Sequence, residues 1–226
     1  LTMDFHAERV IAEEFMKFLM NGTLYQGSKP VMWSPVEQTA LAEAEVEYHD
    51  KDSFTIWVKF KVVGGGDLVD AQVVIWTTTP WTMPSNKAVV YGAGISYGLY
   101  EITGTPDECW VNVGDKYLLA DNMAADVLGR ARLEDGQWAR VRDVTTAELE
   151  TISLNHPLHG VEGGNGEWDD LRDFRAADFV TDTDGTGFVH CAPSHGLDEY
   201  DLYRDLGMLD QVITYNVMPD GRYRDD

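Results

Sequence analysis

Residues 71–86 read Ala-Gln-Val-Val-Ile-Trp-Thr-Thr-Thr-Pro-Trp-Thr-Met-Pro-Ser-Asn, an apolar run that passes directly into a cluster of hydroxyl side chains. The β-branched and aromatic residues of 71–76 predict a buried strand. Two prolines follow the threonines, so the chain turns at the rim of the predicted sheet. Side-chain hydroxyls both donate and accept hydrogen bonds, and this density of them is typical of a small polar pocket. The alternative is an ordinary Thr-Pro turn whose hydroxyls bond only to local backbone.

Short β patterns continue on both sides of this stretch. Further strands are predicted at 54–62, 89–91, 97–102, 109–113, 140–142, 150–154, 177–180 and 187–190, and helices at 4–21, 39–48, 116–128 and 198–206. Many short strands with glycine turns and few helices predict a mainly β fold with helices, closed into a β-barrel-like domain. We expect residues 1–30 to form an N-terminal helix and connecting linker, and residues 31–226 to form the main domain.

The composition limits the class of protein. The 226 residues are 44% hydrophobic and include two cysteines, which make no disulfide framework. No stretch approaches the roughly 20 apolar residues of a membrane span. The first residues lack a basic region followed by an apolar run, so no secretory signal is expected. The sequence therefore predicts a cytoplasmic protein that is not bound to a membrane.

The formal net charge of −22 weighs against broad contact with nucleic acid. An acidic surface repels a phosphate backbone. Three interpretations remain open: the chain binds no nucleic acid, it contacts only a tip through a local site, or its acidity adapts it to a saline interior where charges are screened.

A second polar segment, Gly185-Thr-Gly-Phe-Val-His-Cys-Ala-Pro-Ser-His-Gly-Leu-Asp-Glu-Tyr200, contains the strand predicted at 187–190. His190 lies at the end of that strand, where its ring can face a pocket. Asp198 and Glu199 fall in the first turn of a predicted helix. There a carboxylate can cap the helix, or it can hold a cation such as a substrate ammonium. The competing interpretation of His190 is a half-buried histidine with its bonds satisfied.

Cys191 suggests two other sites. A cysteine nucleophile needs a nearby base, and adjacent strand residues face opposite ways, so His195 would have to serve rather than His190. This cysteine hydrolase remains the less favoured alternative. A zinc site needs more ligands than Cys191, His190 and His195 readily offer, so we expect no metal and no cofactor.

Several segments, in order, resemble the editing domain inserted into isoleucyl-tRNA synthetase (connective polypeptide 1). They are Val31-Met-Trp-Ser-Pro35, residues 39–48, the threonine segment, Asn155-His-Pro157 and residues 185–200. The valyl and leucyl enzymes share the glycine and threonine motifs, but they typically carry lysine or methionine at the position of His190. The resemblance spans essentially the whole chain and implies the closed β-barrel-like fold of these editing domains over residues 31–226.

The resemblance also implies a reaction, hydrolysis of the ester of valine wrongly attached to tRNA(Ile). Its implied partners are the valine-charged acceptor end of that tRNA and the remainder of the synthetase, with its Rossmann catalytic domain. The signature motifs that bind ATP, of the His-x-Gly-His and Lys-Met-Ser-Lys-Ser types, are absent. The chain thus resembles an excised editing domain. The alternative is a non-catalytic module that docks the acceptor end with an impaired pocket.

The resemblance implies two groups of site residues. The catalytic group is Thr77, Thr78, Thr79, His190 and Glu199, and the substrate-binding group is Trp81, Thr82, Asn86, Gly187, Phe188 and Asp198. The family carries aspartate where this chain has Glu199. By position we expect Glu199 to hold the substrate amino group and Asp198 to cap the helix.

Overall fold

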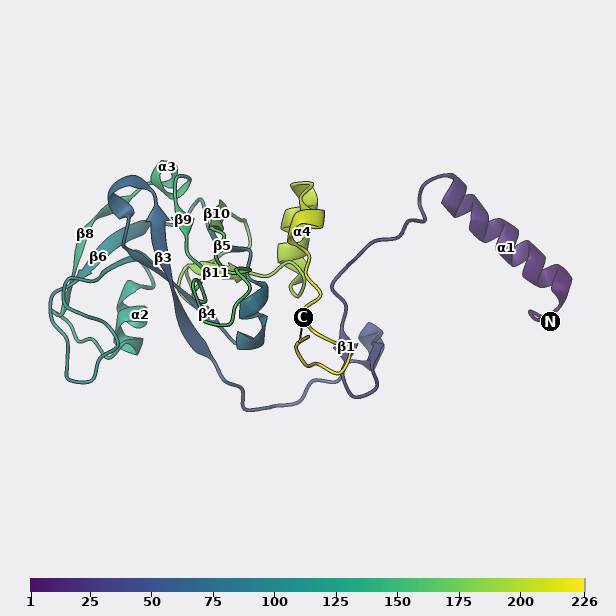
Figure 1. The fold of residues 1–226 in the computed structure, drawn as a ribbon, viewed down its shortest axis with the longest axis horizontal. Coiled ribbons are helices and arrows are strands. Elements are labelled where there is room, and N and C mark those ends of the chain that lie inside the picture. The colour runs from purple at the N-terminus through teal and green to yellow at the C-terminus, as the bar shows by residue number, and fades with distance from the viewer. Residues whose placement is uncertain (226) are drawn as a thin grey trace.

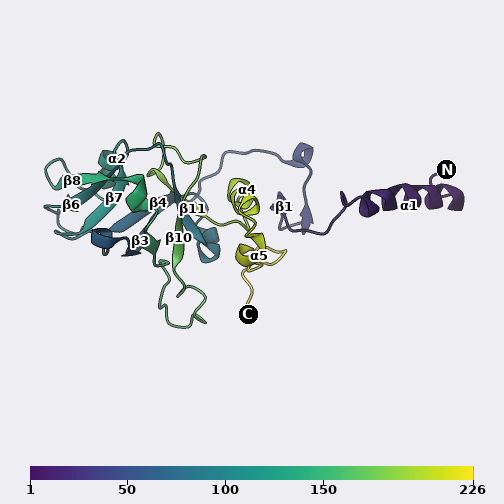
Figure 2. The ribbon, with the colours of Figure 1, turned by 90° about the horizontal axis from the view of Figure 1, so that it is seen from above.

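The N-terminal part of the chain lies apart from the sheet. The computed structural model describes residues 1–225, and helix α1 (Phe5–Met20) extends away from the rest of the protein in Figures 1 and 2. Asp4 caps this helix by accepting a hydrogen bond from the backbone N–H of His6, and none of its residues is buried. The predicted helix is confirmed, and its apolar side chains are exposed.

A two-stranded hairpin follows, formed by β1 (Trp33–Ser34) and β2 (Thr39–Ala40). The helix predicted at 39–48 is wrong, because only a short 3-10 turn, η1 (Glu43–Glu45), forms there. This segment buries no residue, so helix propensity alone is not supported by the packing of an apolar face.

The main body is one mixed sheet of nine strands (Figure 1). The strands are β3 (Ile56–Gly64), β4 (Gln72–Thr77), β5 (Ala88–Tyr91), β6 (Tyr97–Ile102), β7 (Lys116–Ala120), β8 (Trp138–Val144), β9 (Ser153–Leu154), β10 (Arg172–Ala176) and β11 (Phe188–Cys191). Their order is β11-β5-β10-β9-β3-β4-β7-β6-β8, with β10–β5 and β4–β7 parallel and the other pairs antiparallel.

The predicted closed barrel is therefore wrong. A barrel requires its first and last strands to pair, whereas β11 and β8 are the two edges of an open sheet. Short strands and glycine turns are common to barrels and open mixed sheets. The alternation of apolar and polar residues along each strand therefore does not reveal which strands pair.

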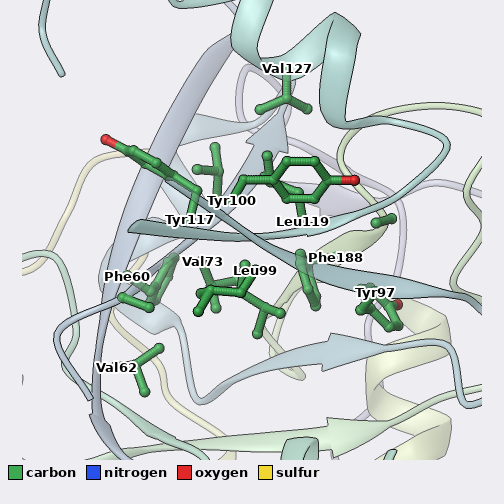
Figure 3. Close-up of a cluster of buried hydrophobic side chains, with 14 of the residues drawn as sticks. Phe60, Val62, Val73, Tyr97, Leu99, Tyr100, Tyr117, Leu119, Val127 and Phe188 are labelled. Atoms are coloured by element: carbon green, nitrogen blue, oxygen red, sulfur yellow. The ribbon is translucent and has the colours of Figure 1, made fainter. Parts of the chain in front are cut away.

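The helix predicted at 116–128 is divided between two elements. Residues 116–120 form β7, and α2 (Ala124–Arg130) begins only four residues later. Tyr117 to Ala120 are all buried and pair with β6, so this apolar run has no exposed face that distinguishes strand from helix. Val127 of α2 packs over core residues of the sheet in Figure 3.

Two other predicted strands are also wrong. Residues 109–113 have no regular structure, and residues 177–180 follow β10 rather than forming a strand. The remaining short elements are η2 (Gly66–Leu68), η3 (Pro80–Ser85), α3 (Thr146–Leu149), α4 (Leu197–Asp205) and α5 (Leu209–Val212). None of the helices among residues 1–225 has the length and apolar character needed to cross a membrane.

The fold brings the two polar segments together. β4 ends at Thr77 and leads into η3, while β11 ends at Cys191 and leads into α4. β11 pairs with β5 and also lies against β4. A second apolar cluster fixes α4 beside the sheet, and it includes Val90, Cys191 and the fully buried Tyr203. The ends of β4 and β11 thus face one another beneath the first turn of α4.

Candidate functional site

A pocket of about 260 Å³ lies where β4, η3, β11 and α4 meet. Its lining residues are Trp76, Thr77, Thr78, Thr79, Trp81, Thr82, Val189, His190, Ala192, His195, Gly196 and Glu199. The pocket therefore combines both polar segments singled out in the sequence.

The threonines form one wall of this pocket. The Thr77 hydroxyl lies 3.3 Å from that of Thr79 and accepts a hydrogen bond from the Thr79 backbone N–H at 3.1 Å. Thr77 is buried, whereas Thr78 and Thr79 are exposed. Thr77 therefore shapes the loop, and the other two hydroxyls are accessible to a ligand.

His190 is held by hydrogen bonds on both ring nitrogens. The Asn86 amide donates to its Nδ1 at 2.7 Å, so the network assigns the proton to Nε2, which donates to Thr82 Oγ1 at 2.9 Å. The Thr82 hydroxyl in turn donates a hydrogen bond to the carbonyl of Thr79 at 2.9 Å. Burial lowers the pKa of His190 to about 4, with smaller contributions from His156 and His195. The imidazole is thus neutral and forms part of the pocket wall, and both of its ring nitrogens are engaged in hydrogen bonds.

The two carboxylates of α4 have different surroundings. Glu199 lines the pocket, whereas Asp198 is exposed and does not. The Glu199 side chain folds over Gly196, since a Cβ built there would lie 1.7 Å from Oε2. Burial raises the pKa of Glu199, and a hydrogen bond from its own backbone N–H opposes this shift. A cationic ligand would relieve the cost of ionising this half-buried carboxyl.

The remaining residues expected to bind substrate do not all reach the pocket. Trp81 lines it with a half-exposed ring, and Asn86 is buried behind His190. Phe188 instead lies in the hydrophobic core, stacked on Tyr97 at 4.8 Å between ring centroids (Figure 3). Gly187 also faces the core, because a Cβ there would lie 2.2 Å from the Cβ of Ala120.

A second hydrogen-bond network was not predicted from the sequence as part of the pocket. His195 Nε2 lies 3.0 Å from Ser85 Oγ, and Ser85 donates to Asn216 Oδ1 at 2.7 Å. The ring of Trp81 meets His195 edge-on, at 5.0 Å between centroids and 77° between planes. Ser85 and Asn216 are 131 residues apart, so no local motif could have revealed their contact.

The η3 loop is fastened from outside by three donors. His156 Nε2 bonds to the carbonyl of Met83 at 2.9 Å, and Trp168 Nε1 donates to that of Pro84 at 3.0 Å. The Tyr223 hydroxyl donates to the carbonyl of Trp81 at 2.6 Å. The loop that carries Trp81 and Thr82 is thus rigidly attached to distant parts of the chain.

Acid should weaken this framework through its buried histidines. Burial is the main cause that lowers the pKa values of His156 and His190 to about 4 from 6.5. The unfolded chain therefore binds these protons first, and stability is lost as the pH falls from 6.5 towards 4, by up to about 1.4 kcal/mol per pH unit for each histidine. Urea unfolding at stepwise pH measures this loss.

The variant His190→Gln should show a shallower decline of unfolding free energy over that pH range than the unmodified protein. His159→Gln is the matched control, because His159 is exposed. Equal slopes for all three proteins would contradict the assignment of His190 as a buried neutral imidazole.

The structure does not support a cysteine hydrolase. Cys191 is fully buried in the second apolar cluster and does not line the pocket. Burial raises the pKa of its thiol, which disfavours the reactive thiolate. Within residues 1–225, no group of three or more His, Cys, Asp and Glu side chains could hold a metal ion.

The pocket, with its hydroxyl wall and opposing carboxylate, belongs to a chain with clear relatives. Residues 1–189 match the family model described as tRNA synthetases class I (I, L, M and V). The chain belongs to this family.

Its similar relatives are isoleucine–tRNA ligases. The chain is 76% identical over 226 residues to the enzyme of Ruegeria pomeroyi, with 100% of this chain and 23% of the relative aligned. It is 49% identical to that of Caulobacter vibrioides over 227 residues, covering 98% of this chain and 22% of the relative. The chain thus spans about a quarter of the length of the curated relatives it matches.

The solved structures that align with part of this chain include editing domains of leucyl-tRNA synthetases. The cytosolic enzyme's editing domain from P. knowlesi aligns with a TM-score of 0.47 and 12% identity, over 75% of this chain and 68% of that one. The corresponding P. falciparum domain aligns with a TM-score of 0.45 and 11% identity, over 67% and 53% of the two chains.

Proposed function

We propose that this chain is an editing domain that hydrolyses the ester of valine wrongly attached to tRNA(Ile). The observation that carries the proposal is the pocket itself, in which a half-buried Glu199 faces the hydroxyls of Thr78 and Thr79 beside the neutral wall of His190. The similarity to isoleucine–tRNA ligases along the whole chain supports it.

Selection between valine and isoleucine explains why such a pocket is needed. One methylene changes binding by only about 1–3 kcal/mol, or roughly 10- to 200-fold, a range whose standard example is this enzyme family. A second site must therefore remove the smaller amino acid after it has been attached. A pocket of about 260 Å³ with a wall fixed by hydrogen bonds suits a small substrate side chain.

The side chains take separate roles in this proposal. Glu199 holds the substrate ammonium, and a charge-assisted hydrogen bond of this type contributes about 1.5–3 kcal/mol. Thr78 and Thr79 bond to the ester or the terminal ribose. His190 limits the space beside the amino acid, while Asn86 and Thr82 fix its ring.

The partners follow from the same proposal. The charged acceptor end of tRNA(Ile) enters the pocket, and the remainder of the synthetase, including a Rossmann catalytic domain, holds the tRNA body and makes the ester in the cytoplasm. A local contact with the tip of the tRNA is compatible with the net charge of −22, because the phosphate backbone of the body does not have to approach this surface.

Release of amino acid from charged tRNA tests the proposal. The full-length protein should free valine from Val-tRNA(Ile) much faster than isoleucine from Ile-tRNA(Ile). Equal rates for the two substrates would contradict the proposed specificity. Binding of the charged tRNA without release of either amino acid would instead identify a docking module.

A further inference from the structure

The two histidines that line the pocket differ in what their ring nitrogens can do. Both nitrogens of His190 are occupied, by Asn86 and Thr82. His195 has only Nε2 engaged, with Ser85. Its Nδ1 has no hydrogen-bond partner among residues 1–225 and is not one of their fully buried unpartnered atoms, so it is not sealed from solvent. His195 is thus the histidine of the pocket that can still accept a proton.

The Ser85–Asn216 pair determines which nitrogen of His195 carries the proton. Ser85 has one hydroxyl proton, which it donates to the Asn216 carbonyl oxygen at 2.7 Å. Its oxygen must therefore accept from the N–H of His195 Nε2 at 3.0 Å. This leaves a lone pair on Nδ1. The edge-on contact with the Trp81 ring restrains the His195 ring further.

We propose that His195 is the general base of ester hydrolysis in this pocket, and that Ser85 and Asn216 are positioning residues that fix its tautomer. This proposal rests on the proposed editing function. A base oriented by hydroxyl and amide groups that do not themselves react follows the general arrangement of activated catalytic sites.

The chemical step balances without a cofactor. A water oxygen attacks the ester carbonyl carbon, and one water proton moves to His195 Nδ1. The tetrahedral intermediate collapses, the bond between the acyl carbon and the ribose oxygen breaks, and the imidazolium returns its proton to that oxygen. The products are free amino acid and tRNA with an intact ribose hydroxyl.

The surroundings keep His195 in its basic form at neutral pH. Burial lowers its pKa, and the neighbouring Asn216 side chain opposes this shift. Two other titratable groups line the same pocket, the neutral His190 and the carboxyl of Glu199. Because Glu199 must also ionise to hold a cation, the loss of rate in acid has two sources, and a variant that moves only one of them is required.

Single-turnover hydrolysis of Val-tRNA(Ile) by the full-length protein, from pH 5 to 8, tests the assignment. His195→Ala should lower the rate constant at saturation by about 10²- to 10⁴-fold. Its dissociation constant for a non-hydrolysable valyl-adenosine amide should stay within about threefold, since His195 acts on water. His159→Ala, an exposed histidine outside the pocket, should leave the rate unchanged.

Asn216→Asp separates a base from a merely structural histidine. An added carboxylate beside the Ser85–His195 pair raises the pKa of His195, so the acid side of the rate profile should move to higher pH. Asn216→Ala should move the acid side of the profile to lower pH, and it should lower the rate less than His195→Ala does. An unmoved profile in both variants, or a His195→Ala rate within threefold of the unmodified protein, would overturn the proposal.

The same series separates this proposal from the editing function. If the unmodified protein releases valine while His195→Ala is equally active, only the role of His195 fails. If the unmodified protein releases no valine at high concentration, the editing function fails and the role of His195 fails with it.

Discussion

Replacing Glu199 with alanine is expected to lower the rate of valine release by about tenfold to a few hundredfold while leaving the fold intact. The substrate ammonium loses its water on entering the pocket and requires a carboxylate partner. A charge-assisted hydrogen bond worth about 1.5–3 kcal/mol corresponds to that loss. Glu199 is the acidic side chain that lines the pocket. Deacylation kinetics, with circular dichroism as the check on folding, measures the effect.

Asp198→Ala is the matched control for this change. Asp198 is the neighbouring carboxylate on α4, but it is exposed and does not line the pocket. Its loss should change the deacylation rate by less than about twofold. A damaging Asp198→Ala together with a silent Glu199→Ala would show that the anchor is the other carboxylate. Two silent variants would contradict anchoring by either.

Replacing Gly187 with alanine is expected to destabilise the protein by about 2–5 kcal/mol. The backbone of Gly187 has φ +78°, and a Cβ would lie 2.2 Å from the Cβ of Ala120 in the core. Overpacking costs about 1–3 kcal/mol, and a left-handed conformation costs a side chain about 1–2 kcal/mol more. At about 2–4 °C per kcal/mol, the melting temperature should fall by roughly 5–20 °C.

Gly185→Ala provides the comparison for that prediction. Gly185 has a similar φ of +74°, but its nearest neighbour, Trp76, is 3.7 Å from the position of a Cβ. Gly185→Ala should therefore lose only the stability that a left-handed backbone conformation costs a side chain, without the cost of overpacking. If both substitutions lower the melting temperature equally, the close contact with Ala120 does not determine the role of Gly187. If Gly187→Ala melts normally but loses substrate affinity, the residue belongs to the pocket instead.

The parts of the fold that depend on local pattern could be predicted from the sequence. The alternating residues up to Val62 form β3, and the apolar run up to Thr77 forms β4. Asp4 caps the start of α1, as the sequence predicts. The barrel closure could not be predicted, because strand order depends on pairings between distant segments. The strand at Tyr117 could not be told from a helix for a related reason, since residues buried on both faces show no hydrophobic period.

The candidate site divides in the same way. The threonine cluster, His190 and Glu199 meet at one pocket, as their residue types suggested. Phe188 shares a face of β11 with His190. It lies in the core instead of the pocket, because it begins the strand opposite Tyr91 and stacks on Tyr97. The relay from His195 through Ser85 to Asn216 joins segments far apart in the chain, and no spacing rule predicts such a contact.

A crystal structure with a non-hydrolysable valyl-adenosine amide tests the central claim most directly. We predict that the ligand occupies the pocket between the threonine segment and α4, with its ammonium within hydrogen-bond distance of Glu199 and its side chain against His190. The water nearest its carbonyl carbon should bond to Nδ1 of His195. A ligand bound outside this pocket, or one whose ammonium contacts neither carboxylate of α4, would contradict the account.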